Sequence, residues 1–183
     1  MTPSTTPQDV LAWWFAPETK PQWFGGGAAF DAAVRDRLGP LWTRAAEGLL
    51  DGWAVEPRGL LALVILFDQV PRNIFRGTAR AFAGDARALA LARLAVDRGF
   101  DQGMSVDERL FLYLPFEHAE DLADQERSVA LFRALGDADY LDYALRHKDV
   151  IERFGRFPHR NAILGRPSTA AELAFLEQPG SSF

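Results

Sequence analysis

Hydrophobic residues recur along most of the chain at intervals of three and four positions, the spacing of one face of an α-helix. The strict alternation typical of half-buried strands is nearly absent. Thr6 stands before a proline, and Ser105 and Thr169 are each followed three positions later by glutamate, a pattern typical of helix starts. We therefore predict an all-α protein of about seven helices, over residues 7–15, 28–50 (with a break allowed at Gly39-Pro40), 57–70, 84–98, 105–119, 121–135 and 138–154, with a short one over 168–177.

Two of these segments, Leu60–Phe67 and Ala86–Val96, are apolar nearly all round. A helix without a polar face must be covered on several sides, which favours a central helical layer. Pro71 is expected to end the first of these helices. The apolar run is far shorter than the roughly 18 residues of a membrane span, so no membrane partner is expected.

The composition indicates one globular domain over residues 1–177, followed by a flexible tail over 178–183. The chain has 183 residues, of which 48% are hydrophobic and 25% charged. There is no cysteine, which excludes disulfides, zinc–thiolate sites, iron–sulfur clusters and thiol catalysis.

The net charge of −5 and the lack of any run of Lys and Arg argue against a nucleic-acid partner. The first seven residues do not resemble a secretory signal, so a cytoplasmic location is predicted.

The first polar cluster follows the apolar run and comprises Asp68, Gln69, Arg72, Asn73 and Arg76. Arginine binds a carboxylate or phosphate through two parallel bonds, so this turn would suit an anionic ligand. The alternative is an internal aspartate–arginine latch at the end of the helix. The sequence leaves the two interpretations open.

The second cluster, Glu117 and His118, follows Pro115 at an abrupt change from apolar to acidic residues. A desolvated glutamate and a nearby imidazole can titrate near neutral pH, so the pair is a candidate for acid/base catalysis. The alternative is that Glu117, together with Glu120 and Asp121, forms the acidic first turn of the next helix.

His147 shares a predicted helix face with Tyr140, Tyr143, Ile151 and Phe154, and is therefore expected to point inward. It is either a ligand-binding histidine or a core histidine whose hydrogen bonds are satisfied within the fold.

The third cluster lies in a predicted loop and comprises Arg156, His159, Arg160 and Asn161. Loops on rigid scaffolds often carry binding sites. We predict His159 as a third acid/base candidate and the other three as ligand-binding residues. The alternative is a surface loop whose arginines cap the preceding helix.

Motifs for metals and cofactors are missing or incomplete. His118 and Asp121 form one His-x-x-Asp pair, no His-Glu-x-x-His occurs, and there is no Gly-x-Ser-x-Gly or phosphate-binding glycine motif. We therefore predict no metal and no cofactor.

Three segments carry a resemblance to a known family: LVILFDQVPRNIFRGTARAFAGD (63–85), FLYLPFEHAEDLADQERSVALF (111–132) and FGRFPHRNAILGRPST (154–169). Together with the tryptophans near the N-terminus they resemble the bacterial domain of unknown function 924 family, over about residues 9–177. The resemblance implies an α-α superhelix similar to tetratricopeptide-repeat proteins and implies no reaction. It coincides with the three polar clusters.

Two functional hypotheses remain. In the first, the three clusters converge on a pocket for a small anionic molecule, a carboxylate or phosphate, with Glu117, His118 or His159 handling protons; whether the protein is an enzyme stays open. In the second, the protein is a helical scaffold that binds a peptide or partner protein through exposed aromatic residues, namely Trp13, Trp14, Trp23 or Phe24. A third, structural interpretation is that the charged clusters are only latches between helices. The oligomeric state is not predicted.

Overall fold

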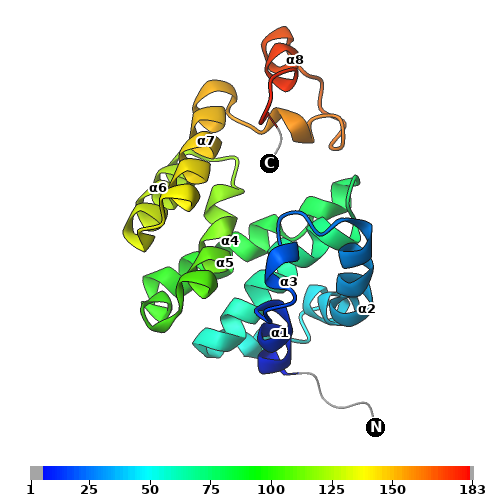
Figure 1. Ribbon diagram of the computed structural model, residues 1–183, viewed down its shortest axis with the longest axis vertical. Coiled ribbons are helices and arrows are strands. Elements are labelled where there is room, and N and C mark those ends of the chain that lie inside the picture. The colour runs from blue at the N-terminus through cyan, green and yellow to red at the C-terminus, as the bar shows by residue number, and fades with distance from the viewer. Residues whose placement is uncertain (1–5, 182–183) are drawn as a thin grey trace. The chain divides into compact units, whose positions relative to one another are not determined.

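The computed structural model describes residues 6–181, and within this range the chain forms helices and no strand. There are eight α-helices rather than about seven, because the short C-terminal segment is also an α-helix (Figure 1). Their bounds are α1 Pro7–Trp14, α2 Gly27–Ala46, α3 Pro57–Ile74, α4 Asp85–Asp97, α5 Val106–Glu117, α6 Leu122–Leu135, α7 Ala138–Phe154 and α8 Ala170–Leu176. The predicted capping boxes at Ser105 and Thr169 are confirmed: each side chain accepts a hydrogen bond from a backbone N–H three residues on, and that residue's glutamate accepts one in return. No helix among the described residues is long and apolar enough to cross a membrane.

The chain divides into two compact units. Unit 1 comprises Met1–Arg76 and Arg80–Pro115, and unit 2 comprises Gly77–Ala79 and Phe116–Phe183. The single domain over 1–177 stays a prediction. Residues 1–5 lie outside the described residues; they are part of the N-terminal segment that was compared with secretory signals. Residues 182–183 of the predicted tail also lie outside them.

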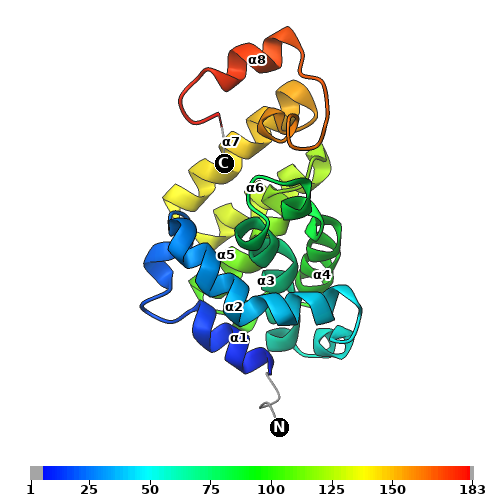
Figure 2. The same ribbon diagram turned by 90° about the vertical axis from the view of Figure 1, so that its right-hand side faces the viewer.

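Unit 1 is built around α3. This helix packs against α1, α2 and α4 (Figures 1 and 2), and every residue from Gly59 to Pro71 is buried. Burial on all sides explains the apolar run of α3 and confirms that this helix is covered on several sides. The same expectation for Ala86–Val96 is wrong, because Ala88, Ala92 and Ala95 are the only buried residues of α4.

The helix end predicted at Pro71 is wrong, and the break that was allowed at Gly39-Pro40 does not occur. α2 continues through Pro40, and α3 continues through Pro71 to Ile74. Pro71 has no N–H to donate to the Phe67 carbonyl, one turn back. The backbone of Gly84 lies against that carbonyl oxygen, so closely that a Cβ on Gly84 would come within 2.0 Å of it. The helix therefore persists beyond the proline, with a glycine packed where the missing hydrogen bond would be.

The tryptophans near the N-terminus form part of the core of unit 1. Trp14 and Trp23 are buried, and the Trp23 indole N–H donates to the Trp14 carbonyl over 2.9 Å. Both rings pack edge-on against Phe111. Phe24 is the exception in this group, with 66% of its surface exposed.

Unit 2 contains the hairpin of α6 and α7 and, after it, the loop that leads to α8. Gly136 ends α6 with a φ of +84°, a left-handed conformation that suits glycine. Val150, Ile151, Phe157 and Phe175 form a buried apolar cluster that joins α7, the loop and α8. Within the predicted tail, Ser181 is buried and donates to the Leu176 carbonyl.

Candidate functional site

The first polar cluster lies in unit 1, in the last turns of α3, where its side chains bond to each other and to neighbouring helices. Arg72 donates to both oxygens of Asp85 at the start of α4 (2.7 and 3.1 Å) and lies 3.3 Å from a carboxylate oxygen of Asp68. The Gln69 amide donates to Asp68 over 2.6 Å, and the Asn73 amide donates to the Gln69 carbonyl.

Arg76 makes the second link of this cluster, to α2. Its guanidinium donates to both oxygens of Asp31 at 2.7 and 2.8 Å, and this contact raises the pKa of Arg76. Burial lowers the pKa of Arg72, but the charges of Asp68 and Asp85 outweigh it, so that the pKa is raised. These ion pairs are the geometry expected of latches between helices, one of the two interpretations that the sequence left open.

The second and third clusters both lie in unit 2, and there the structure brings their histidines together. Glu117 ends α5, His118 follows it, His147 comes from α7, and His159 and Arg160 lie in the short 3₁₀ turn Pro158–Arg160. All three histidines of the chain belong to this group, which we call the histidine cluster; its members are Glu117, His118, His147, His159 and Arg160.

The aromatic ring of Phe157 links the cluster. This ring is fully buried, and its centroid lies 5.6 Å from those of both His147 and His159. The Arg160 guanidinium lies over the same ring at 4.6 Å. The rings of His118 and His147 are 6.4 Å apart. One apolar ring therefore contacts one cation and two imidazoles.

His147 is the most deeply placed of the histidines. Its Nδ1 lies 2.9 Å from the Tyr143 carbonyl and 3.5 Å from a carboxylate oxygen of Glu117. Because a carbonyl can only accept, Nδ1 carries the proton and Nε2 is left with a lone pair. Tyr143 itself is 53% exposed, so the prediction that it points inward with His147 is wrong. The face of α7 that is buried runs through Ala144, His147 and Ile151 instead.

The surroundings of His147 disfavour its protonation. Burial is the main reason that the pKa of His147 is lowered to about 3; the neighbouring His118, Arg160 and His159 contribute in the same direction, and the hydrogen bond to the Tyr143 carbonyl opposes them. Arg160 and two further imidazoles thus lie near a buried ring that also has the Glu117 carboxylate 3.5 Å away.

The loop that carries His159 and Arg160 is held by two ion pairs, one formed by Arg156 before these residues and one formed by Arg166 after them. Arg156 donates to both oxygens of Glu172 in α8, at 2.6 and 2.8 Å, and this contact, with the Thr169 cap, lowers the pKa of Glu172. Arg166 donates to both oxygens of Glu120, at 2.6 and 2.9 Å. Glu120 also accepts the Phe157 backbone N–H over 2.8 Å.

Asn161 is part of this second link. Its side-chain oxygen accepts from Arg166 at 3.0 Å, and its amide donates to Ser168 at 3.1 Å. Arg156 and Asn161 therefore hold the loop in place, whereas His159 and Arg160 are the residues that the loop presents. The sequence pattern did not single out Arg166 as a functional residue, and it marked Glu120 only as a helix-start acid.

Pro115 lies within α5, which runs on to Glu117, as the helix predicted over residues 105–119 allows. Pro115 stands two residues before the end of the helix. Among residues 6–181, no group of three histidine, aspartate or glutamate side chains has an arrangement that could hold a metal ion.

Comparison with known proteins places the chain in a family. Residues 10–180 match the family described as "Bacterial protein of unknown function (DUF924)". The chain belongs to this family. Its fold is similar to the solved structure of a protein of unknown function from Agrobacterium tumefaciens, with 46% sequence identity, a TM-score of 0.87, and coverage of 93% of this chain and 96% of that chain. No curated protein matches it. DUF924 membership confirms the resemblance noted in the sequence. The family's description names no reaction.

Proposed function

We propose that unit 2 binds a small anion, a carboxylate or a phosphate, at the histidine cluster. The observation that carries the proposal is the grouping around the buried Phe157 ring, which has the Arg160 guanidinium over it at 4.6 Å and the rings of His147 and His159 at 5.6 Å, with His118 beside His147. An anion placed there would gain from the charge of Arg160, and electrostatic attraction is stronger in a partly desolvated site than in water.

The chemistry that this cluster would supply is proton transfer. Neutral His147 has its Nδ1–H directed at Tyr143 and Glu117, which fixes the ring and leaves Nε2 as an acceptor. A bound anion would favour the protonated form of this ring, so that His147 could take a proton from the ligand while Glu117 stabilises the resulting charge.

The proposal is narrower than the three-cluster pocket expected from the sequence. Arg72, Arg76 and Arg156 each engage a carboxylate through two hydrogen bonds and lie outside the histidine cluster. The proposed cation of the site is Arg160, because its guanidinium lies over the Phe157 ring that also contacts His147 and His159. The proposed anion site also excludes Gln69, Asn73 and Asn161, because their side chains make hydrogen bonds within the fold.

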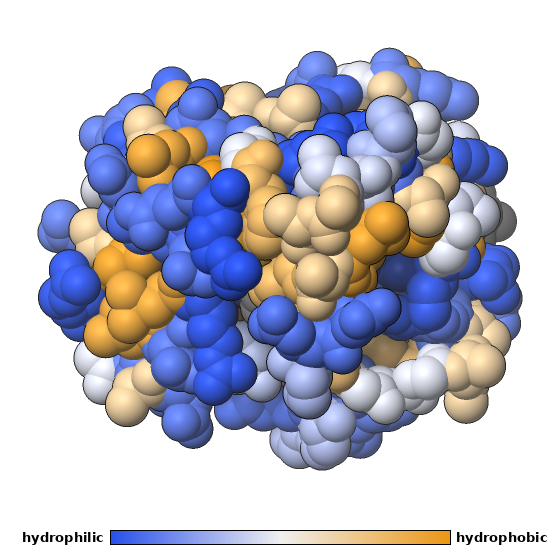
Figure 3. Space-filling model, turned by 90° about the horizontal axis from the view of Figure 1, so that it is seen from above, coloured by the Kyte–Doolittle hydropathy of each residue, from blue (hydrophilic) through white to orange (hydrophobic). Residues whose placement is uncertain are grey.

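The scaffold hypothesis requires a surface patch of aromatic residues, and two of its four candidates, Trp14 and Trp23, are buried. Figure 3 shows one face of the chain, on which hydrophobic patches are interrupted by hydrophilic groups. The superhelix similar to tetratricopeptide-repeat proteins and the cytoplasmic location stay predictions from the sequence.

Inorganic phosphate is expected to stabilise the wild-type chain against heat, and Arg160→Gln is expected to remove most of this effect. At a phosphate concentration about ten times Kd, linkage predicts a rise of roughly 3–6 °C in Tm. The measurement is a thermal-shift titration with phosphate, acetate and malonate, each against sodium chloride at equal ionic strength.

The matched control is Arg146→Gln, which removes the same charge from α7 at a side chain that is 58% exposed. This variant should keep the full response to the anions. His159→Gln provides a second test with a smaller change in charge, and it should weaken the response. A response of wild-type protein no larger than that to chloride would overturn the proposal, as would an unchanged response in both Arg160→Gln and His159→Gln.

A further inference from the structure

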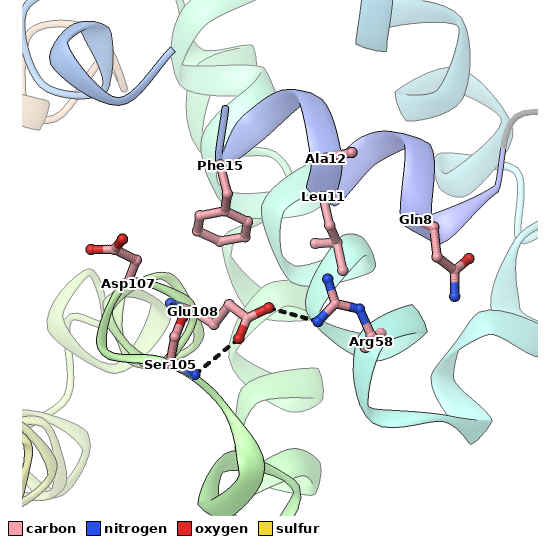
Figure 4. Close-up of a pocket in the computed structure, with 8 residues that line it drawn as sticks. All are labelled: Gln8, Leu11, Ala12, Phe15, Arg58, Ser105, Asp107 and Glu108. Carbon is pink, nitrogen blue, oxygen red and sulfur yellow. Dashed lines mark hydrogen bonds and ion pairs between the residues drawn. The ribbon is translucent and has the colours of Figure 1, made fainter. Parts of the chain in front are cut away.

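Unit 1 contains a pocket that is separate from the clusters described above. It has a volume of about 380 Å³ and lies beside α1, the start of α3 and the start of α5 (Figure 4). Its lining residues are Gln8, Leu11, Ala12 and Phe15 from α1, Arg58 from α3, and Ser105, Asp107 and Glu108 at the start of α5. The size falls at the lower end of the range of small-molecule sites.

One wall of the pocket is a single face of α1. Its four residues are spaced three and four apart, so they line up along the helix. Gln8 stands at the N-terminal end of this face, and the apolar side chains of Leu11, Ala12 and Phe15 follow it (Figure 4). This wall therefore offers an amide at one end and an apolar surface along the rest.

The opposite wall is charged, and both of its carboxylates are already engaged. Glu108 accepts Arg58 Nη1 on one oxygen at 2.8 Å, and the Ser105 backbone N–H on the other at 2.9 Å. Asp107 forms an ion pair with Lys20 at 2.5 Å. A cationic ligand would have to displace one of these partners.

The hydrogen-bond donors of the pocket, in contrast, are only partly used. Arg58 donates to Glu108 through Nη1 alone, and its Nε and Nη2 donate to no other described residue. The side-chain amide of Gln8 likewise makes no hydrogen bond with any residue in the described part of the chain. Glu108 holds the guanidinium in position beside α1, as Figure 4 shows. The polar groups left for a ligand are therefore donors, and one of them is positively charged.

We propose that this pocket binds a small carboxylic acid with an aromatic or short aliphatic body. The carboxylate would bind Arg58 and Gln8, and the apolar body would lie on Leu11, Ala12 and Phe15. A guanidinium with two nitrogens available matches the two oxygens of a carboxylate. The inference stands apart from the proposed function of unit 2, because every residue that it uses belongs to unit 1.

The test compares three probes with the same aromatic body and different head groups: phenylacetate, phenylacetamide and 2-phenylethylamine. Binding to the full chain is measured by isothermal titration calorimetry and by ligand-observed NMR. Phenylacetate should bind most tightly, the amide more weakly and the amine weakest. Arg58→Gln should weaken phenylacetate binding about tenfold or more, and Gln8→Ala by a smaller factor.

Two control variants distinguish a site at Arg58 from a general loss of positive charge and from the histidine cluster. Arg44→Gln removes an exposed arginine of α2 in the same unit and should leave phenylacetate binding unchanged. Arg160→Gln, in unit 2, removes any binding of phenylacetate at the histidine cluster and should leave the Arg58-dependent binding unchanged. Arg58 is 54% exposed, so Arg58→Gln should melt close to the wild-type temperature.

Three results would overturn the inference: no saturable binding of phenylacetate, equal or tighter binding of 2-phenylethylamine, or unchanged phenylacetate binding in Arg58→Gln. Loss of phenylacetate binding in Arg160→Gln alone would assign the ligand to the histidine cluster instead, and would likewise contradict a site in unit 1.

Discussion

Replacing Arg72 with alanine is expected to lower the free energy of unfolding by about 3–5 kcal/mol, the range measured when one partner of a buried ion pair is removed. Asp68 is fully buried and would lose its ion pair with Arg72, and Asp85 would lose two hydrogen bonds. The Gln69 amide would remain on Asp68, but it carries no charge. The measurement is urea unfolding at pH 7, followed by far-ultraviolet circular dichroism.

The control for this prediction is Arg76→Ala, which removes a similar two-bond contact at a more exposed place. The Arg76 side chain is 61% exposed, so the loss of its pair with Asp31 should cost about 1 kcal/mol or less. A double-mutant cycle of Arg72→Ala with Asp85→Ala isolates the energy of that one pair. Wild-type stability of Arg72→Ala would refute the latch and return Arg72 to the candidates for ligand binding.

Most of the fold was predictable from the sequence because local signals decided it. The apolar run of α3 requires cover on all sides, and α1, α2 and α4 provide it in unit 1. Capping boxes need only residues that are three positions apart. Helix continuation at Pro71 was not predicted, because the local rule that a proline ends a helix ignores the tertiary packing around it, here that of Gly84 against the Phe67 carbonyl.

The candidate site was predictable in its residue types and not in its pairings. Every histidine and arginine of the clusters was identified from the sequence, but of their acidic partners only Asp68 and Glu117 were. Asp31 lies 45 positions from Arg76, and Glu120 lies 46 positions from Arg166. Sequence spacing carries no information about such pairs, so it could not separate arginines that are latched, such as Arg72, from Arg160, which faces the histidines.

Acidification is expected to destabilise the wild-type chain more than His147→Gln, by about 2–3 kcal/mol between pH 7 and pH 4.5. The pKa of His147 is lowered to about 3 in the folded state, against an ordinary value of 6.5 in the unfolded chain. Between these two values the unfolded state binds the extra proton, so stability falls as the pH falls from about 6.5 towards 3. Urea unfolding of both proteins at a series of pH values gives the difference directly.

Carboxylates also contribute to acid unfolding, but they are common to both proteins and cancel in the comparison. The groups that face His147 are Glu117, His118, His159 and Arg160, and they remain in His147→Gln. Matching acid profiles of wild type and variant would contradict the lowered pKa, and so would an imidazole NMR resonance of His147 that titrates near 6.5.

The same NMR titration connects this property to the proposed function. An anion bound at the histidine cluster would offset the positive charge of Arg160, which helps to keep His147 neutral. Saturating phosphate should therefore raise the pKa of His147, and the Arg160→Gln variant should show a smaller rise because it binds phosphate less well. By linkage, phosphate should then bind more tightly as the pH falls toward the pKa of His147. A pKa of His147 that does not move with phosphate would mean that the anion binds elsewhere, and that His147 is a core histidine with its hydrogen bond satisfied by Tyr143.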